Sequence, residues 1–203
     1  MNEMKRRGRP LRAETDIEDE RARVAAIAGT LFQHEGIEAI SMRRLAKEAG
    51  VTPKTLYAYF ADKRDILQHV WAKFFVELFD QIDQIATSNK GPRARLRAAC
   101  LHYLAYWIDQ PERYRMVFMS GGVSQSDVSI FLDASPIIER YAVFGALMDA
   151  LAEPWEPTQA TANLNALICA LNGIAHNKIT ISNYDWGKSE ALLDTLLPGI
   201  IGS

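Results

Sequence analysis

A helical repeat runs through almost every part of this chain of 203 residues. Apolar residues recur at intervals of three or four, as at Ile66, Val70, Phe74 and Leu78, and no segment alternates in the way that a half-buried strand does. We therefore expect an all-α protein. The clearest of the predicted helices span about residues 16–35, 129–152, 158–181 and 188–201.

Composition restricts the class of protein further. Apolar residues make up 48% of the chain and charged residues 24%, which is ordinary for a folded globular protein. No apolar stretch approaches the roughly 18 residues that a membrane span needs, and the basic N-terminus lacks the apolar core of a secretory signal. We expect a cytoplasmic protein without membrane contact. Cys100 and Cys169 lack the spacing of a metal or redox motif, so we expect both to be reduced core residues.

Charge is distributed unevenly along the chain. Through Arg64 the sequence holds 13 Lys and Arg against 10 Asp and Glu, whereas the remainder holds 10 against 15. A basic N-terminal part followed by an acidic remainder suits a protein that binds a polyanion through its N-terminal part alone. A charged tail that only aids solubility is the alternative for the N-terminal arm. The arm residues that we expect to contact this polyanion are Lys5, Arg6, Arg7 and Arg9.

Residues 41–60 predict two short helices joined at Gly50, which is the outline of a helix-turn-helix unit. Ser41 is a good N-cap for the first helix. Thr52 and Pro53 define the start of the second, because the Thr52 hydroxyl can accept an orphan N–H and proline has none to leave unpaired. The sequence therefore predicts a recognition helix that begins at Pro53.

The predicted recognition helix has two unlike sides. At about 100° per residue, Leu56 and Phe60 fall on the side that packs on the domain core. The opposite side carries a cation, a hydroxyl and a methyl group, flanked by two phenols: Lys54, Thr55 and Ala58, with Tyr57 and Tyr59 at the edges. Such groups can reach base edges and phosphates in a DNA groove.

Lys54 and Lys63 each stand in the first turn of a predicted helix, where the helix dipole disfavours a cation by several tenths of a kcal/mol. A DNA phosphate at these positions would supply the missing negative charge. Two lysines that extend into water are the alternative.

The stretch RVAAIAGTLFQHEGIEAISMRRLAKEAGVTPKTLYAYFADKRDIL, residues 23–67, resembles the DNA-binding domain of the TetR family of bacterial transcriptional regulators along its whole length. The Leu31-Phe32 pair, the Gly36 break and the segments LAKEAGV, TLYAYF and DKRDIL occur in the family's order and spacing. The resemblance implies an all-α homodimer that binds a palindromic operator. It also implies a larger C-terminal helical domain that binds a ligand and dimerises.

The resemblance assigns DNA-contacting roles to individual residues. It implies that Ser41 contacts a phosphate and that Arg43 reaches a base edge. Arg44 departs from the acidic or small residue that the family often has there, and we expect an added phosphate contact from it. The other residues implied to line the DNA are Thr52, Lys54, Thr55, Tyr57, Tyr59 and Lys63.

The body segment YLAYWIDQPERYRMVFMSGG, residues 103–122, resembles the WHG-like variant of the family's C-terminal domain. The helix before its proline is apolar around most of its circumference, so it should be enclosed. We expect a mostly apolar effector pocket there, because aromatic and methionine side chains suit planar or strongly apolar ligands. Ordinary core packing is the alternative. The candidate lining residues are His102, Tyr103, Trp107, Phe118, Met119, Tyr141, Phe144, Met148, Asn172 and His176.

The last two predicted helices carry apolar stripes that could form a four-helix bundle with a second copy of the chain. The alternative is that these stripes face the subunit's own core. The candidate interface residues are Leu164, Leu167, Ile168, Leu171, Ile174, Leu192, Leu193, Leu196 and Ile200.

These features predict the organisation of the whole chain. We expect a basic flexible arm, a DNA-binding domain that contains the helix-turn-helix unit, a connecting helix, and a ligand-binding and dimerisation domain. Their predicted bounds are residues 1–15, 16–64, 65–86 and 91–203.

The function expected is that of a repressor that binds double-stranded DNA as a homodimer and is released by a small-molecule effector. We expect no enzymatic activity, cofactor or metal. A helical-bundle metalloenzyme would need inward Glu-x-x-His elements, and none of the 4 histidines has a glutamate three residues before it. A ligand-independent DNA-binding regulator and an activator remain open alternatives.

Overall fold

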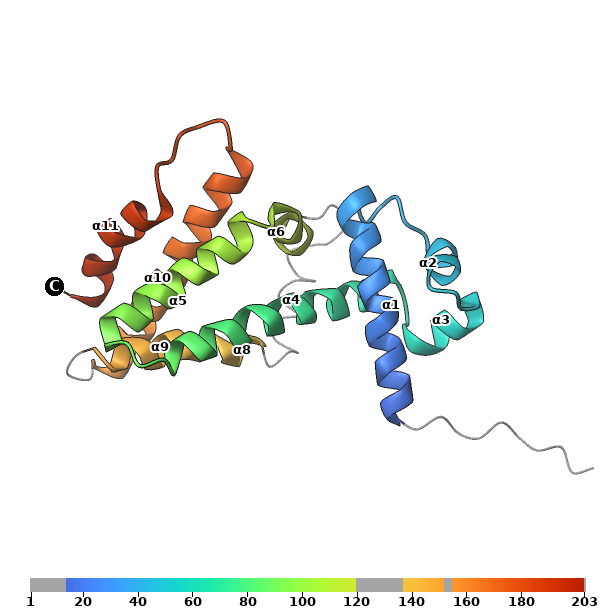
Figure 1. Ribbon diagram of the computed structural model, residues 1–203, viewed down its shortest axis with the longest axis horizontal. Coiled ribbons are helices and arrows are strands. Elements are labelled where there is room, and N and C mark those ends of the chain that lie inside the picture. The colour runs from blue at the N-terminus through green and yellow to red at the C-terminus, as the bar shows by residue number, and fades with distance from the viewer. Residues whose placement is uncertain (1–13, 120–136, 152–154, 203) are drawn as a thin grey trace, which may run out of the picture. The chain divides into compact units, whose positions relative to one another are not determined.

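The computed structural model describes residues 14–119, 137–151 and 155–202, and every regular element within these ranges is a helix. The chain divides into two compact units, Met1–Val70 and Trp71–Ser203. The boundary falls inside α4 (Figure 1). The helices are α1 (Glu14–Glu35), α2 (Met42–Glu48), α3 (Pro53–Tyr59), α4 (Lys63–Ala86), α5 (Pro92–Ile108), α6 (Pro111–Phe118), α8 (Ile137–Arg140), α9 (Ala142–Asp149), α10 (Pro157–Thr180) and α11 (Ser189–Ile201).

The first unit is held together by one apolar face from each of its helices. Phe32 of α1, Leu45 of α2, Leu56 of α3 and Ile66 of α4 are all buried in its core. α1 begins at Glu14 rather than at about residue 16, and Gly36 follows its last residue with a φ of +81°. A glycine in this left-handed conformation is the usual stop signal of a helix, so the predicted end of the first helix is confirmed.

The second unit is built around α5, which contacts α6, α9, α10 and α11. Figure 1 shows α10 running beside it. The prediction of an enclosed helix is confirmed only for one broad side of α5, because Ala105 on the opposite side is exposed. The buried residues of α5 are Leu96, Ala99, Cys100, Tyr103, Leu104, Tyr106 and Trp107.

Ion pairs join neighbouring helices of the second unit. Arg97 of α5 lies 2.7 Å from Asp194 of α11. Arg140 of α8 lies 3.0 Å from Asp80 and 2.7 Å from Asp83, both on α4. Because each pair is partly exposed, it adds little to the free energy of unfolding. Its main effect is to determine which helices are neighbours.

Two expectations are changed by the structure. Cys100 is buried as predicted, but Cys169 is exposed on α10, so its assignment to the core is wrong. The helix predicted over 129–152 is present as the short helices α8 and α9, which are separated at Tyr141. The earlier part of that prediction lies outside the described residues.

Candidate functional site

Defined caps position α2 and the turn that follows it. Ser41 Oγ accepts a hydrogen bond of 3.2 Å from the backbone N–H of Arg44, which confirms Ser41 as the N-cap. At the other end, Gly50 adopts a φ of +67° and the Val51 N–H donates to the Ala46 carbonyl at 2.9 Å. This pattern closes a helix with a glycine in the left-handed region. The chain therefore turns sharply into α3.

Thr52 caps α3 as predicted. Its Oγ1 accepts a hydrogen bond of 3.1 Å from the Thr55 N–H and lies 2.9 Å from Thr55 Oγ1. Pro53 occupies the first helical position, where its missing N–H leaves no donor unpaired. The two threonine hydroxyls thus engage each other at the start of α3.

The two sides of α3 differ as the helical wheel predicts, with one exception. Leu56 is fully buried, whereas Lys54, Tyr57 and Ala58 are exposed. Tyr59, which the wheel places at the outer edge, is only 9% exposed, so that prediction is wrong. Tyr59 follows Leu56 by three residues, and this spacing places both on one apolar stripe.

Arg44 is held by acidic side chains of the protein. Its Nη1 and Nη2 donate to the Glu35 carboxylate oxygens at 2.5 and 2.7 Å, and its Nε lies 3.8 Å from Glu48. The hydrogen-bonded Glu35 carboxylate raises the pKa of Arg44 above its ordinary value. This bidentate pair joins α2 to the last residue of α1. The added phosphate contact expected of Arg44 is therefore not favoured, because its guanidinium already has a partner.

Lys63 also has a partner within the protein. It lies in the first turn of α4, and its Nζ donates a hydrogen bond of 2.8 Å to the Ile37 carbonyl, in the turn between α1 and α2. The spacing of residues in the sequence does not predict that the Ile37 carbonyl lies beside Lys63. The ammonium group keeps two further hydrogens, which can donate to a phosphate.

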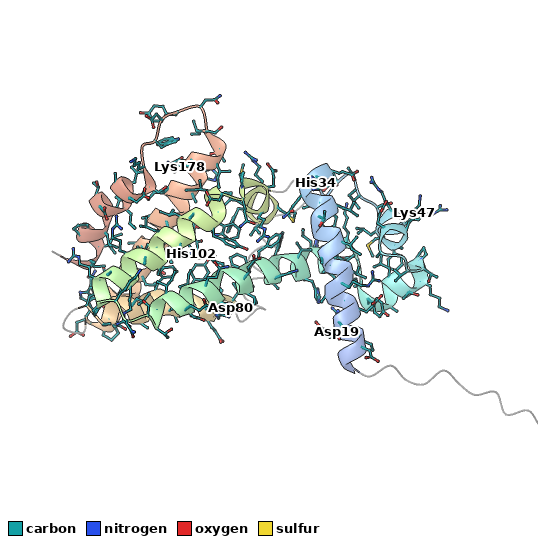
Figure 2. All side chains as sticks on the ribbon, in the orientation of Figure 1. Asp19, His34, Lys47, Asp80, His102 and Lys178 are labelled. Carbon is teal, nitrogen blue, oxygen red and sulfur yellow. The ribbon has the colours of Figure 1, made fainter. Side chains whose placement is uncertain are left out.

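Three cations near α2 and α3 have no such partner. Arg43, Lys47 and Lys54 are exposed, and none forms an ion pair or side-chain hydrogen bond with another described residue. Figure 2 shows Lys47 on α2. The predicted arm contacts Lys5, Arg6, Arg7 and Arg9 lie outside the described residues.

Two arginines of α1 make contacts that the sequence does not predict. Arg21 Nη2 lies 2.8 Å from His69 Nε2, and Arg23 Nη2 donates to the Ala49 carbonyl at 2.9 Å. Neither contact follows from helical spacing, because the partners are 48 and 26 residues away in the chain.

The five phenylalanine, tyrosine and tryptophan residues of the predicted pocket form a packed aromatic cluster in the second unit. Tyr103 and Trp107 are fully buried, with ring centroids 6.4 Å apart. Phe144 lies 6.0 Å from Tyr103, and Phe118 lies 5.4 Å from Trp107. The rings of these pairs meet edge to face, which is the usual geometry of aromatic side chains in a protein core.

A chain of polar groups passes through this cluster. The Tyr103 hydroxyl donates to Asn172 Oδ1 at 2.7 Å, and the Tyr141 hydroxyl lies 3.2 Å from it. Burial raises the pKa of both phenols, to about 12 for Tyr141. Of the polar residues expected in the pocket, Asn172 is thus brought together with the two phenols, and these three groups satisfy one another.

The other candidate pocket residues are placed differently. Met148 is buried, whereas Met119 is 45% exposed and His176 is exposed. His102 lies on α5 (Figure 2), where burial lowers its pKa and its Nε2 has no hydrogen-bond partner among the described residues. Tyr114, which is absent from the predicted lining, has its hydroxyl 3.3 Å from His176 Nδ1.

The predicted dimer helices bury part of their apolar stripes inside the subunit. Leu167 and Leu171 of α10 are fully buried and Leu193 of α11 nearly so. The prediction that these three form a subunit interface is wrong, because other helices of the same subunit already cover them: α10 packs on α5 and α9, and α11 packs on α5 and α10. Ile174 is also mostly buried. The candidate interface residues that keep partial or full exposure are Leu164, Ile168, Leu192, Leu196 and Ile200.

An open groove of about 270 Å³ lies between α10 and α11. Lys178, at the end of α10 (Figure 2), donates to the Gly187 carbonyl at 2.5 Å and so closes the connection between the two helices. The groove is mostly apolar. Its lining residues are Ala170, Gly173, Ile174, Asn177, Lys178, Trp186, Leu192 and Leu196.

Two further features are absent from the part of the chain that the structure describes. None of its helices combines the length and apolarity of a membrane span. Its His, Cys, Asp and Glu side chains nowhere gather in threes as metal ligands would.

Comparison with known proteins gives the first unit a family. Residues 25–70 match the family described as bacterial regulatory proteins, tetR family. An HTH-type transcriptional regulator of Staphylococcus aureus strain USA300 is 42% identical over 77 residues, which cover 36% of this chain and 42% of that protein. The match thus spans less than half the length of this curated relative.

Solved structures extend the likeness to the whole chain. A TetR-family transcriptional regulator from Pectobacterium atrosepticum has a TM-score of 0.71 and 26% identity, over 95% of this chain and 99% of that one. The regulator FadR from Bacillus subtilis, solved with stearoyl-CoA, has a TM-score of 0.68 and covers 89% of this chain and 98% of its own. At 14% identity, this second likeness concerns the fold alone. The all-α fold with an N-terminal helix-turn-helix domain and a larger C-terminal domain is confirmed. Residues 25–70 match the tetR family of bacterial regulatory proteins, and nearly the whole chain is similar to a TetR-family transcriptional regulator.

Proposed function

We propose that this regulator is a repressor that binds a palindromic DNA operator as a homodimer and leaves it when a small-molecule effector binds. The observation that supports DNA binding most directly is the outer side of α3, where Lys54, Tyr57 and Ala58 are exposed while Leu56 is fully buried. A cation, a phenol and a small methyl group on the second helix of a helix-turn-helix suit the major groove. The proposed place of action is the cytoplasm.

The operator can be identified by selection from duplexes of random sequence. Purified protein retains the duplexes that it binds, and sequencing of the survivors gives the preferred site. The proposal expects two inverted half-sites whose centres lie about 34 Å apart, or a multiple of that distance. Survivors that share no sequence would contradict the proposal of an operator.

We propose two kinds of contact with this DNA. Arg43 reads a base edge, since its exposed guanidinium is unpaired within the described residues and can form a bidentate pair with guanine. Ser41 contacts a phosphate, as does Lys63 through the two hydrogens that its bond to Ile37 leaves free. The threonine pair at the start of α3 and the exposed Lys54 and Tyr57 complete the contact surface: Thr52, Thr55, Lys54 and Tyr57.

The basic arm is proposed to lie in the minor groove beside each recognition helix, as basic N-terminal arms do in other DNA-binding proteins. Lys5, Arg6, Arg7 and Arg9 would then release counterions from the DNA. Removal of residues 1–12 should lower affinity and flatten its dependence on salt concentration. If the dependence of DNA affinity on salt concentration does not change, the arm does not contact DNA and serves only solubility.

The homodimer is proposed to form through the exposed sides of α10 and α11. Leu196 is 42% exposed and lines the groove between the two helices together with Leu192. An apolar surface on two neighbouring helices can form a four-helix bundle with the same surface of a second copy. A two-fold dimer would also match the inverted half-sites of the proposed operator.

The proposed effector is a compound with a long apolar chain or a flat ring. The aromatic cluster around Tyr103 and Trp107 suits such ligands, and the fold neighbour FadR from Bacillus subtilis was solved with stearoyl-CoA. A second neighbour is named as the fatty acid degradation regulator FadR from Bacillus halodurans. Long-chain acyl compounds are therefore the first class to screen, followed by planar aromatic compounds.

Two tryptophans allow the screen to locate the bound compound. Trp107 lies in the aromatic cluster, whereas Trp186 lines the groove between α10 and α11. If the effector binds in the cluster, its effect on fluorescence should disappear in Trp107→Phe and persist in Trp186→Phe. The reverse pattern would move the effector site to the groove.

A ligand-independent regulator is the alternative, and one observation favours it. The rings of the cluster are in direct contact with one another, and Tyr103 and Trp107 are fully buried. A cluster packed in this way matches an ordinary protein core. An operator complex that no acyl or aromatic compound dissociates would support this alternative, and a reporter gene would then distinguish a repressor from an activator.

A further inference from the structure

Arg23 occupies a position in α1 from which it reaches the turn of the helix-turn-helix. Its Nε and Nη2 donate to the two carboxylate oxygens of Glu20 at 3.1 and 2.5 Å, which fixes the plane of the guanidinium. The same Nη2 donates to the Ala49 carbonyl at 2.9 Å. One side chain therefore connects the first helix to the end of α2.

Ala49 is the C-cap of α2, where backbone carbonyls lose their intrahelical partners. It is buried, and Gly50 follows with a φ of +67°, so the chain leaves for α3 at this point. A cationic donor on such a carbonyl satisfies it and opposes the negative end of the helix dipole. Arg23 thus holds the residue from which the recognition helix departs.

We propose that Arg23 is a positioning residue for DNA recognition, which holds the turn between α2 and α3 on α1 and so sets the orientation of α3 without touching DNA. The inference rests on the proposed DNA-binding function. Hydrogen bonds to base edges need accurate geometry, whereas phosphate contacts carry no sequence information. Loosening this turn should therefore reduce sequence discrimination and leave general affinity for DNA in place.

The test compares two affinities of the same protein. Wild-type protein first selects a preferred duplex from a random-sequence library, and Kd is measured for that duplex and for a random-sequence duplex over a series of salt concentrations. Arg23→Gln should lower the ratio of the two affinities about fivefold, as expected for the loss of one hydrogen bond. Its salt slope on the random-sequence duplex should equal that of the wild type.

Lys54→Gln is the contrasting variant, because Lys54 is exposed on the outer side of α3. It should weaken binding to both duplexes and reduce the salt slope by about one, as the loss of a phosphate contact does. If Arg23→Gln behaves in this way instead, Arg23 contacts DNA and the inference is overturned.

Glu20→Gln tests the same inference from the other side of the ion pair. The substitution weakens the two hydrogen bonds from Arg23 to residue 20, so it should lower the affinity ratio, as Arg23→Gln does. An arginine that contacts phosphate would instead be released for DNA, and binding to both duplexes would become tighter. An affinity ratio that neither substitution changes would also overturn the inference.

Two controls keep these outcomes separate from folding and from the proposed function. Circular dichroism melting and titration of the active fraction ensure that unfolded protein is not counted as lost discrimination. If Arg23→Gln does not fold, Arg23→Lys replaces it, since an ammonium group cannot reproduce the planar fork. If wild-type protein selects no duplex, the proposed function fails together with the inference. If the wild type selects a duplex and the ratio of the two affinities is unchanged in the variants, the inference fails but the proposed function does not.

Discussion

The Tyr103 hydroxyl donates a hydrogen bond of 2.7 Å to Asn172 Oδ1 and so joins α5 to α10. The Tyr103 hydroxyl has only one hydrogen to donate, so the Tyr141 hydroxyl, 3.2 Å away, donates to Tyr103. The order of donors along this chain is therefore Tyr141, Tyr103 and Asn172. Removal of the middle hydroxyl leaves both neighbours without their partner.

Tyr103→Phe should lower the free energy of unfolding by about 1–3 kcal/mol, because it leaves polar groups unpaired inside the second unit. Urea unfolding followed by circular dichroism measures this change. Tyr184→Phe is the matched control, since Tyr184 is 63% exposed and the same atom is removed. The control should change stability by less than about 0.5 kcal/mol. Equal effects of the two substitutions would contradict the role given to the hydrogen-bond chain.

The same chain predicts a loss of stability at high pH. A tyrosine in the unfolded chain has a pKa of about 10, whereas burial raises the pKa of Tyr141 to about 12 in the folded protein. The unfolded state therefore loses its proton first, so the stabilisation is complete below about pH 10 and is lost as the pH rises through about 12. Tyr141 should account for about 2–3 kcal/mol of this loss.

Tyr141→Phe isolates this contribution from the other groups that titrate in the same range. Its free energy of unfolding should fall less steeply between pH 10 and pH 12 than that of the wild type. Parallel curves for the two proteins would show that Tyr141 does not keep its proton in the folded state.

Arg43→Ala and Lys63→Ala should weaken DNA binding in different ways. Loss of the proposed base contact of Arg43 should cost roughly 1–3 kcal/mol and relax the preference at one base pair in each half-site. Lys63→Ala should weaken binding to all duplexes alike, and it also removes the bond to the Ile37 carbonyl. Competition titrations with single-base variants of the selected duplex distinguish the two patterns. A sequence preference left unchanged by Arg43→Ala would remove its base-reading role.

Leu196→Glu should give folded monomers that no longer bind the operator. Leu196 is 42% exposed in the groove between α10 and α11, and burial of its new carboxylate against a second copy is unfavourable. Sedimentation should show that the dissociation constant of the dimer is at least about tenfold higher than in the wild type. Val76→Glu is the control, because Val76 is 48% exposed on α4, outside this groove. A Leu196→Glu protein that stays dimeric would place the interface elsewhere.

Local features of the DNA-binding unit were predictable because they depend on neighbouring residues. Ser41 and Thr52 cap their helices through backbone groups three residues ahead, and Gly50 takes the positive φ that a sharp turn needs. The error at Tyr59 has a local cause as well. An apolar stripe is at least about 100° wide, and Tyr59 lies only about 60° from Leu56 around the helix.

Contacts between distant residues were not predictable from spacing. Nothing in the chain indicates that Arg44 will pair with Glu35 rather than with a phosphate, because tertiary folding brings these side chains together. The stripe with Leu167 and Leu171 illustrates the same limit in the second unit. Periodicity identifies an apolar face, but an identical pattern results whether the face meets α5 or a second subunit.

The unequal burial of the two cysteines gives the protein a built-in attachment point. Cys100 is buried with its thiol pKa raised to about 12, so at neutral pH it carries almost no reactive thiolate, whereas Cys169 is exposed on α10. A maleimide dye or a nitroxide should therefore label Cys169 alone in the unaltered sequence. Two such labels in a dimer would report their mutual distance by electron spin resonance, and would do so with the regulator alone, with DNA added, and with each compound of the effector screen.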